Sequence, residues 1–439
     1  MPLRKILNTI AILLSLVAAG GAQEVLYSFQ GGSDGQNPSI SGLVFDEEGN
    51  IYGTTGWGGA GAYCNENFLG PCGIVYELTP DSNGGWTKTT LYNFCSLPNT
   101  LPNCADGQYP LGVVRDSAGN LYGVTSFGGA NDQSADGAGV VFELTPNGSG
   151  WTESVLYNFC SLQNCIDGEQ PGSNLIIDGK GNLYGTTYAG GSSNRGTVFK
   201  LSRSGSGWTL TTLHSFSGSD GVNPSAPLLL GNGGLFGTTP GGGAHGEGVV
   251  FEISSSSGGP KENVLYSFTG KADGGIPAAP LIFDTTGNLY GTAEFYGGHN
   301  KGVAFELVRG SSGTWTYALI HAFAGGTDGA YPEAGLLIDG AGDLYGTTTG
   351  GGGTGCEGVG CGTIFGLTPI TGGGWTETIQ AFSGTDGSTP QDIAKKSVQT
   401  ADEPFDHNVP GKRGCPGGCY GTTYGGGASG FGVVFQAAH

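Results

Sequence analysis

Short apolar runs separated by turn residues recur along the chain, and four kinds of run follow one another in a fixed order. The first is wholly apolar, as in Leu-Ile-Phe at 281–283, and it ends in an Asp-x-x-Gly-Asn turn. The second is Leu-Tyr-Gly-Thr, as at 289–292. The third is like Val-Phe-Glu-Leu at 141–144, and the fourth is like the run from Trp to Phe at 151–159. Aromatic residues, valine and threonine favour strands, whereas glycine and proline interrupt them, so each set predicts four short β-strands.

This set of four strands occurs seven times. The glycine of a Tyr-Gly-Thr-Thr motif, or a near variant, stands at Gly53, Gly123, Gly185, Gly237, Gly291, Gly346 and Gly421. An aromatic residue ends the fourth strand at Phe29, Phe94, Phe159, Phe216, Phe268, Phe323 and Phe382. An Asp-Gly pair follows each of these, beginning at Asp34, Asp106, Asp167, Asp220, Asp273, Asp328 and Asp386. A period of roughly 50 to 75 residues suits the blade of a propeller and is too long for one rung of a β-helix.

The two ends of the repeat region predict how the blades close. The first strand after the N-terminal segment, at 24–29, is of the fourth kind, and the last, at 432–435, is of the third kind. The N-terminal strand is therefore expected to complete the last blade, which leaves no unpaired blade edge. We predict an all-β, seven-bladed β-propeller of four-stranded antiparallel blades, with the ring closed by the N-terminal strand.

The repeated motif resembles a known family. Leu-Tyr-Ser-Phe, Asp-Gly, Pro, Asp-x-x-Gly-Asn-Leu-Tyr-Gly-Thr-Thr, Gly-Gly and Gly-x-Val-Phe-x-Leu follow one another as in the GloVer tandem repeat. That repeat occurs in the "choice-of-anchor" group of exported bacterial proteins. The resemblance covers nearly all of residues 23–439 and implies export and a tandem-repeat architecture. It carries no catalytic residue or ligand with it.

The N-terminal segment has the pattern of a secretory signal peptide. Arg4 and Lys5 precede an apolar run at 10–19, and small residues follow at 20–22. This run is too short to span a bilayer, and no other segment reaches eighteen apolar residues. We expect residues 1–22 to be removed and the propeller, residues 23–439, to be secreted, extracellular or periplasmic, with no insertion into the membrane.

The cysteines support an oxidising compartment. All ten fall into five close pairs, Cys64/Cys72, Cys95/Cys104, Cys160/Cys165, Cys356/Cys361 and Cys415/Cys419. An even number of cysteines in an exported chain predicts disulfides. Zinc is the alternative for Cys415 and Cys419, but it needs two further ligands that the sequence does not place nearby. We therefore predict five disulfides and no metal site.

Composition excludes several classes of partner. The formal net charge is −20, and glycine accounts for 90 of the 439 residues. Such an acidic chain lacks the clustered Lys and Arg that nucleic acids and anionic lipids require. An unidentified extracellular glycan or protein is the expected partner.

The repeated Asp-Gly pairs admit two interpretations. Carboxylate oxygens are ligands for calcium, so seven such pairs are compatible with bound Ca²⁺. Alternatively, every crossover between blades needs the same tight turn, which aspartate and glycine both favour. A feature present in every repeat is explained more simply by the scaffold, and we predict the turn and no cofactor.

Function is expected where the repeats differ. In a propeller, the crossovers between blades and the loops between the second and third strands lie on one face. That loop grows from nine residues at its shortest (187–196) to eighteen at 55–73, and it is also long in the second and sixth repeats. The crossovers into the second and third repeats are longer too, and four of the predicted disulfides lie in these loops and crossovers. Stiff loops on a rigid scaffold suit recognition, so we predict a non-catalytic binding face for glycan or protein.

The fourth and fifth repeats add polar and aromatic residues to the same face. We predict a ligand site formed by His245, Glu247, Glu294, Phe295, Tyr296 and His299. Paired with His245 or His299, Glu294 would be the acid–base candidate of an extracellular polysaccharide hydrolase or lyase near the propeller axis, which is the enzymatic alternative. A structural envelope or matrix protein is the third possibility.

One segment, residues 390–418, departs from the repeat altogether. It concentrates charged residues in a chain that otherwise has few, and it takes the place of the first strand and its turn in the seventh repeat. High local charge favours a poorly structured insert.

Overall fold

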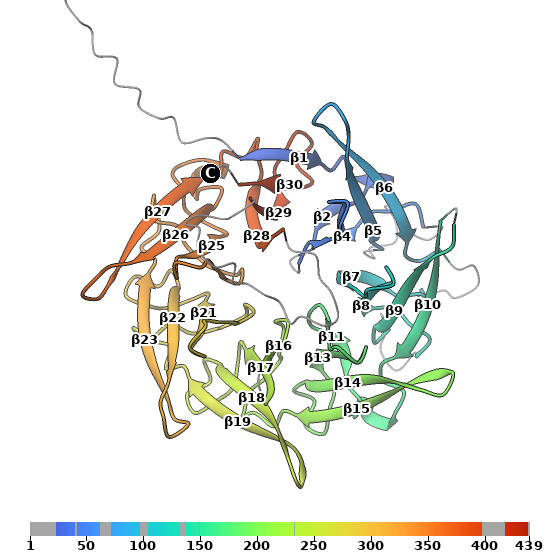
Figure 1. Ribbon diagram of the computed structural model, residues 1–439, viewed down its shortest axis with the longest axis horizontal. Helices are drawn as coiled ribbons and strands as arrows, with labels where there is room; N and C mark the ends of the chain where they lie inside the picture. Colours follow the sequence, from blue (N-terminus) through green and yellow to red (C-terminus); the bar gives the residue numbers. More distant parts are fainter. Residues whose placement is uncertain are drawn as a thin grey trace, which may run out of the picture.

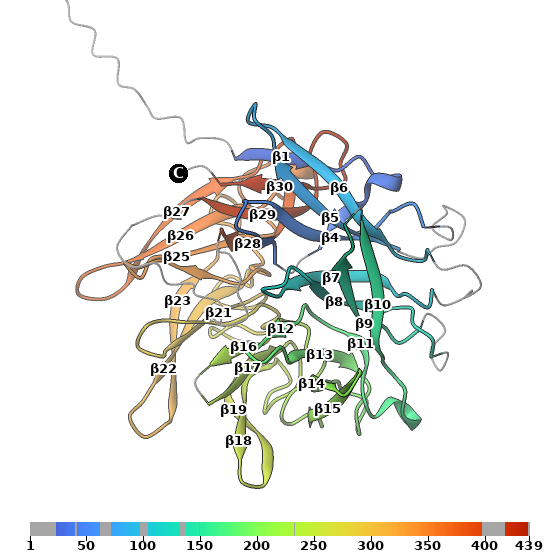
Figure 2. The ribbon, with the colours of Figure 1, turned by 45° about the vertical axis from the view of Figure 1, so that its right-hand side comes forward.

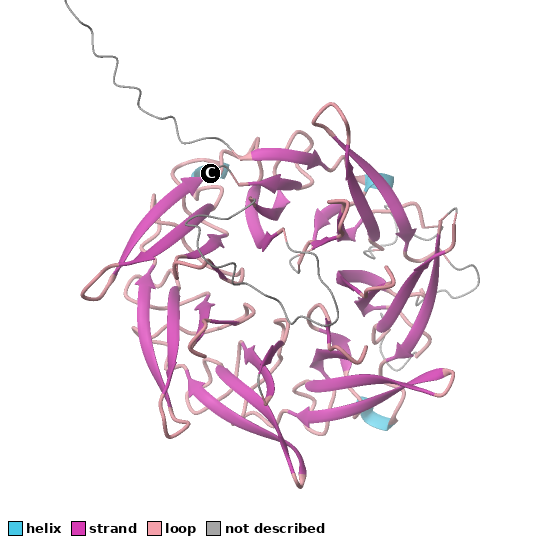
Figure 3. Cartoon of the chain, viewed as in Figure 1, coloured by secondary structure: helices cyan, strands magenta, loops and turns pink. Residues whose placement is uncertain are grey.

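Seven antiparallel sheets stand around a central axis in the computed structural model (Figure 1). The structure describes residues 23–39, 42–61, 72–96, 104–131, 137–148, 150–231, 233–396 and 418–437. Within these ranges helix is confined to the short 3-10 turns Gly32–Asp34, Gln163–Cys165 and Cys356–Gly358 (Figure 3). The predicted all-β propeller is confirmed, whereas the proposed signal peptide, residues 1–22, lies outside the described residues.

Each blade runs from an inner strand beside the axis to an outer strand at the rim. Blade 1 comprises β2 (Gln36–Pro38), β3 (Val44–Phe45), β4 (Ile51–Trp57), β5 (Ile74–Pro80) and β6 (Trp86–Asn93). Blade 2 comprises β7 (Gln108–Arg115), β8 (Leu121–Phe127), β9 (Val140–Pro146) and β10 (Trp151–Asn158). Blade 3 comprises β11 (Glu169–Pro171), β12 (Ile176–Ile177), β13 (Leu183–Ala189), β14 (Thr197–Ser204) and β15 (Gly207–Ser215).

The remaining blades follow the same order. Blade 4 comprises β16 (Leu229–Gly231), β17 (Gly234–Thr239), β18 (Val249–Ser256) and β19 (Gly259–Ser267). Blade 5 comprises β20 (Ile282–Phe283), β21 (Leu289–Ala293), β22 (Val303–Arg309) and β23 (Trp315–Ala322). Blade 6 comprises β24 (Leu337–Ile338), β25 (Leu344–Thr348), β26 (Thr363–Pro369) and β27 (Trp375–Ala381).

Blade 7 is built from both ends of the chain. Its strands are β28 (Ser388–Lys395), β29 (Cys419–Gly425), β30 (Val433–Gln436) and β1 (Glu24–Ser28). β1 pairs antiparallel with β30, so that Val25 lies opposite Phe435 and Ser28 opposite Val433. The two strands lie side by side in both views (Figures 1 and 2). The predicted closure of the ring by the N-terminal strand is therefore confirmed.

An equivalent aromatic pair recurs at every interface between neighbouring blades. The phenylalanine that ends each outer strand meets, edge to face, the ring on the third strand of the next blade, with centroids 5.0–5.2 Å apart. Such pairs contribute about 0.5–1.5 kcal/mol each beyond the area they bury. The seven pairs are Phe29–Tyr76, Phe94–Phe142, Phe159–Phe199, Phe216–Phe251, Phe268–Phe305, Phe323–Phe365 and Phe382–Phe435.

The same rings explain the glycine of the Tyr-Gly-Thr-Thr motif. A Cβ atom at Gly123 would lie 2.4 Å from the Phe142 ring, and one at Gly53 would lie 2.5 Å from the Tyr76 hydroxyl. Any side chain at this position would displace the aromatic ring that joins the blades. The glycine is therefore needed for space.

A second repeated contact ties each inner strand to the preceding blade. In all seven blades the residue before the crossover proline has φ between +53° and +61°, an uncommon conformation for residues other than glycine. Its backbone N–H donates to a carbonyl of the preceding blade at 2.8–3.0 Å. These residues are Asn37, Tyr109, Gln170, Asn223, Ile276, Tyr331 and Thr389.

The seven Asp-Gly pairs form the turns of the crossovers. In blade 3, for example, Asp167 Oδ2 accepts a hydrogen bond from the backbone N–H of Ser161 (2.8 Å) and another from the Tyr157 hydroxyl (2.7 Å). Comparable bonds hold the aspartate of every other pair. The structure thus supports the turn interpretation, because these carboxylates have partners inside their own crossover.

The disulfides brace crossovers and loops as predicted. Cys95–Cys104, Cys160–Cys165 and Cys356–Cys361 are bonded. Cys72 and Cys419 are also disulfide-bonded. Their predicted partners, Cys64 and Cys415, lie outside the described residues.

The divergent segment 390–418 differs from its prediction in one respect. Its first residues do not replace the inner strand of blade 7, since β28 continues to Lys395 and pairs with β29 through a bulge between Pro390 and Asp392. The irregular sequence conceals this strand because its apolar side chains are few. Residues 397–417 lie outside the described residues.

Replacing Phe29 with alanine tests whether the interface between blades 7 and 1 is as stable as the other interfaces between blades. Phe29 and Phe216 are both fully buried and belong to equivalent pairs. We expect Phe29→Ala and Phe216→Ala to lower the free energy of unfolding by similar amounts, about 3–5 kcal/mol. Urea unfolding followed by fluorescence measures both. A loss below about 1 kcal/mol for Phe29→Ala alone would contradict closure by β1.

Glu153 gives the stability of the propeller a dependence on pH. The Glu153 side chain faces Asp106, which accepts a hydrogen bond from the Tyr92 hydroxyl (2.9 Å). The Oε1 atom of Glu153 is buried and has no hydrogen-bond partner. Burial first, and then the charge of Asp106, raise the pKa of Glu153 from 4.5 to about 8. Between these two pH values the folded state retains a proton that the unfolded chain releases. The contribution of Glu153 to the free energy of unfolding is therefore complete below about pH 4.5 and is lost as the pH rises through about 8.

We therefore expect Glu153→Gln, whose amide cannot ionise, to match the wild type at pH 5 and to be more stable than it at pH 9. Urea unfolding at several pH values measures the difference. Glu48→Gln, at an exposed position, removes the same charge and serves as the control. Identical pH dependence in Glu153→Gln and the wild type would refute the assignment.

Candidate functional site

Crossovers and loops between the second and third strands lie together on one face of the propeller. In every blade a glycine of the loop donates its backbone N–H to a carbonyl of the crossover into the same blade, at 2.7–2.9 Å. Gly59 bonds to Gly32 in blade 1, and Gly129 bonds to Cys104 in blade 2. We call this side, which carries the long loops and the bonded pairs Cys95–Cys104, Cys160–Cys165 and Cys356–Cys361, the insertion face.

A narrow cavity lies on the propeller axis. It has a volume of about 150 Å³ and is lined by inner-strand residues of all seven blades. Most of its lining is aliphatic or glycine, and the charged residues, Glu333, Asp392 and Lys395, come from blades 6 and 7. This volume is below the ~300–1,000 Å³ of ordinary small-molecule pockets, so a larger ligand would have to lie across the insertion face.

Two glutamates meet beside this cavity. Glu294 follows β21 in blade 5, and Glu333 follows the crossover proline of blade 6. Their carboxyl groups lie close enough to interact. Burial first, and then the charge of Glu333, raise the pKa of Glu294 to about 7, and burial raises the pKa of Glu333. Like charges this close cannot both ionise readily, so the pair holds a proton near neutral pH.

Polar groups of blades 6 and 7 surround this glutamate pair. Thr349 Oγ1 donates to Glu333 Oε1 (3.3 Å), and Gln391 Nε2 donates to Glu333 Oε2 (3.4 Å). The neighbouring Asp392 is buried, which raises its pKa to about 7, and its Oδ2 accepts a hydrogen bond from the Gly42 N–H (2.9 Å). The arrangement offers both donors and acceptors to a ligand over the axis.

The predicted site residues separate into two groups. Glu294 is partly buried and interacts with Glu333, which lines the axial cavity, whereas His245 and His299 are exposed. Among the described residues, the groups able to hold a metal ion include neither of these histidines. The structure therefore pairs Glu294 with a carboxylate from the next blade.

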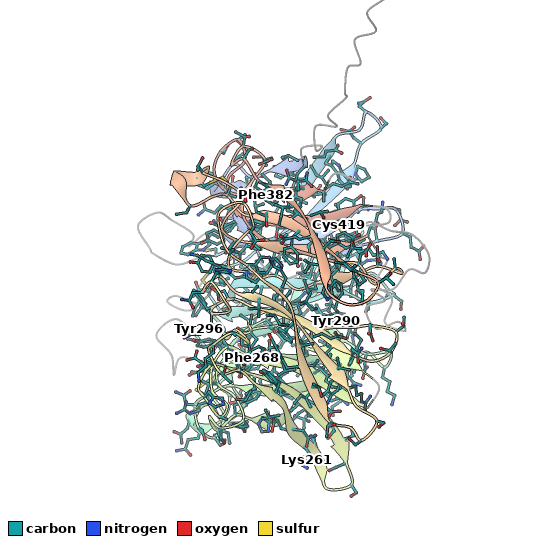
Figure 4. The ribbon with its side chains drawn as sticks, turned by 90° about the vertical axis from the view of Figure 1, so that its left-hand side faces the viewer. Lys261, Phe268, Tyr290, Tyr296, Phe382 and Cys419 are labelled. Carbon is teal, nitrogen blue, oxygen red and sulfur yellow. A yellow bond between two sulfur atoms is a disulfide. The ribbon has the colours of Figure 1, made fainter. Side chains whose placement is uncertain are left out.

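The other three predicted residues do come together with neighbours on the insertion face. Tyr296 lies beside Glu247, and its interaction with that carboxylate raises the pKa of the tyrosine. Phe295 packs against Tyr331, with ring centroids 5.3 Å apart. In the side view, Tyr296 lies at one face of the disc, while Tyr290, at the other end of the same hairpin, lies nearer the opposite face (Figure 4).

An aromatic strip crosses blades 7, 1 and 2 on the insertion face. Tyr109 lies between Trp57 and Phe127, with ring centroids 6.3 Å from each. Burial first, and then Tyr424, raise the pKa of Tyr109. Tyr424 is 40% exposed. We define the aromatic strip as Trp57, Tyr109, Phe127 and Tyr424.

Sequence reasoning missed Glu333, Gln391 and the aromatic strip. The sequence does carry a signal for these residues, at the two positions that flank the crossover proline. Glu333 and Gln391 follow this proline where other blades have small or aliphatic residues such as Leu111 and Ala278. Tyr109 and Tyr331 precede it. Aligning the repeats on this proline would have identified all four residues.

Comparison with known proteins identifies the repeat. The Gloeobacter/Verrucomicrobia repeat family matches residues 63–305 and 257–402. A solved structure of a protein of unknown function from Dyadobacter fermentans is similar over 95% of this chain and 98% of that one, at 11% identity and a TM-score of 0.41. No curated protein matches. Within the described residues, no helix is long and apolar enough to cross a bilayer. Because the two matched segments together span most of the seven repeats, the chain belongs to the Gloeobacter/Verrucomicrobia repeat family.

Proposed function

We propose that this protein is an exported, non-catalytic binding module that holds a neutral glycan on the insertion face. The observation that carries the proposal is the aromatic strip, Trp57, Tyr109, Phe127 and Tyr424, beside a cluster of hydrogen-bonding groups at the axis. Glycan binding is favoured over the alternative protein ligand because aromatic and polar groups occur here in adjoining zones.

The chemistry of a sugar matches these two zones. One face of a pyranose ring presents C–H groups, which pack on the electron-rich face of an aromatic ring, while its hydroxyls need donors and acceptors. Trp57 and Tyr424 offer partly exposed rings, and Gln391 and the glutamate pair offer hydrogen bonds. The rigid blades beneath them reduce the entropic cost of binding.

Charge favours a neutral glycan over an acidic one. The chain has a formal net charge of −20, and Glu333 and Asp392 line the axial cavity, with Glu294 beside Glu333. A uronic acid or sulfated polymer would be repelled by this field, especially at low ionic strength. An uncharged polysaccharide escapes this repulsion.

The glutamate pair suits binding better than glycoside hydrolysis. Retaining enzymes hold their two carboxyl groups about 5–5.5 Å apart and inverting enzymes about 6.5–9.5 Å apart, which leaves room for the reacting atoms. Glu294 and Glu333 instead interact with each other as a pair that holds one proton between them. The pair can accept hydrogen bonds from sugar hydroxyls, while Gln391 offers a donor N–H.

Export is part of the proposal. The disulfides Cys95–Cys104, Cys160–Cys165 and Cys356–Cys361 persist in oxidising compartments and are rare in the cytosol. The signal-peptide pattern of residues 1–22 agrees with this location.

Removing rings from the aromatic strip tests the proposed site. Neutral hexaoses of β-1,4-glucose, β-1,3-glucose and β-1,4-N-acetylglucosamine serve as probes in isothermal titration. We expect at least one to bind, and we expect Trp57→Ala and Tyr424→Ala each to raise its Kd about tenfold or more, equivalent to about 1.4 kcal/mol. The lost contact between ring and sugar is the physical reason.

Leu319→Ala is the matched control, because Leu319 is exposed on the outer strand β23, away from the insertion face. It should leave Kd unchanged. If Trp57→Ala and Tyr424→Ala keep their melting temperature and still bind the hexaose with unchanged Kd, this site is ruled out. Binding by a protein and by none of the glycans would overturn the glycan assignment.

The glutamate pair predicts how binding depends on pH. As pH rises from 6 to 8 the pair loses its proton, since the pKa of Glu294 is about 7, and with it the hydrogen that links the two carboxyl groups and keeps them in place. Affinity for the neutral hexaose should therefore fall over this range. Glu294→Gln retains a donor N–H at every pH, so its affinity should stay constant. A wild-type affinity independent of pH would contradict a role for the pair.

A further inference from the structure

The outer strands of neighbouring blades enclose the aspartate of each Asp-Gly crossover. On one side of the aspartate lies the residue two places before the phenylalanine that ends the outer strand. On the other lies a residue near the start of the next blade's outer strand, such as Lys88, Glu153, Glu262 or Glu377. In two joints these flanking residues are histidine and glutamate, which gives the clusters His214/Asp220/Glu262 and His321/Asp328/Glu377. Neither cluster belongs to the insertion-face site described above.

The donor atoms in the second cluster lie close together. His321 Nε2 is 3.1 Å from Asp328 Oδ1 and 3.3 Å from Glu377 Oε1. In the first cluster, His214 Nε2 is 3.0 Å from Asp220 Oδ2. In both clusters the three ligand atoms all lie within 4.8 Å of one another.

These spacings match the coordination shell of a small divalent metal. Zinc binds imidazole nitrogen and carboxylate oxygen at about 2.0–2.2 Å, usually with tetrahedral geometry. Two ligands of such an ion are separated by about 3.3–3.5 Å, as bonds of this length require. The measured separations of 3.1 and 3.3 Å at His321 therefore need little adjustment around an ion.

A second observation also points to a missing positive charge. Glu262 Oε1 is buried and accepts no hydrogen bond, and buried Glu377 Oε1 accepts none although His321 Nε2 lies 3.3 Å from it. Leaving a buried acceptor unsatisfied costs about 1–3 kcal/mol, and more for a charged group. A metal ion bound at the same position would satisfy this oxygen. The side chains of His321, Asp328 and Glu377 are 19–23% exposed, so an ion can reach them from solvent.

The other joints show what distinguishes these two. At the joint between blades 7 and 1, Lys88 occupies the position of the glutamate, and its Nζ lies 2.8 Å from Asp34 Oδ1. The chain itself supplies a cation there. At the joint between blades 1 and 2, Glu153 faces Asp106, but Tyr92 takes the place of histidine. Histidine thus occurs in this position only together with a glutamate opposite it, within the seven described joints.

We propose that His321, Asp328 and Glu377, and likewise His214, Asp220 and Glu262, each bind one divalent transition-metal ion of the zinc class, with water completing the coordination. Each ion would crosslink two neighbouring blades at the rim, because its ligands come from both. Any proton held between the two carboxyl groups is released to solvent when the ion binds.

Titration of the chelator-treated, full-length mature protein with zinc chloride tests this proposal. We expect two ions per chain for the wild type, one for either His214→Gln or His321→Gln, and none for the double variant. Glu153→Gln, which alters the equivalent carboxylate pair beside Tyr92, should still bind two. Cobalt(II) added in place of zinc should give the visible spectrum of tetrahedral coordination, and the spectrum should disappear in the double variant.

Thermal unfolding separates metal binding from folding. Zinc at 100 times its Kd should raise the melting temperature of the wild type and leave that of the double variant unchanged. Glu377→Gln, which is isosteric, should lose one ion even if the histidine variants fold poorly. Failure of the wild type to bind zinc at micromolar concentration would overturn the proposal and would leave histidine bridging the two carboxyl groups through its proton. Two bound ions in the double variant would overturn it equally.

Discussion

The contact between one phenylalanine and one ring of the next blade determines most of this structure. Each pair fixes the distance and angle between two sheets, and seven similar pairs produce a closed circle. The ring needs its full width, so the strand beneath it has glycine at the contact point. The repeated Tyr-Gly-Thr-Thr motif is thus the local sequence that accommodates a contact made between blades. Interiors packed this closely tolerate little change in volume.

The fold could be predicted from the sequence because its determinants are repeated. Each repeat carries its own strand pattern, turn aspartate and joint phenylalanine, so seven imperfect copies reinforce one interpretation. Closure followed from the type of strand at 24–29, whose pattern matches the fourth strand of the other repeats. The inner strand β28 was missed, because a bulge at Gln391 and scarce apolar residues hide its alternation.

The site was predicted only in part, for a physical reason. Glu294 was singled out because it breaks the pattern of its loop, but its partner Glu333 belongs to the next blade and lies in a crossover. Their contact depends on how far two blades rotate about the axis, and no local pattern encodes that rotation. His245 and His299 were selected by similar loop positions, yet equivalent positions in neighbouring blades point outward to solvent. In a ring, similarity of position places residues around a circle and does not by itself bring them together.

The pairing of β1 with β30 has a consequence for how the molecule is made. The two partners are separated by almost the whole chain, from Glu24–Ser28 to Val433–Gln436. During synthesis β1 stays unpaired until β30, its partner, has been made. Long-range pairing of this kind is slow and leaves a β-edge available to other chains. In the finished circle β1 covers the edge of β30, so the period of greatest risk of aggregation ends when the two ends of the chain meet.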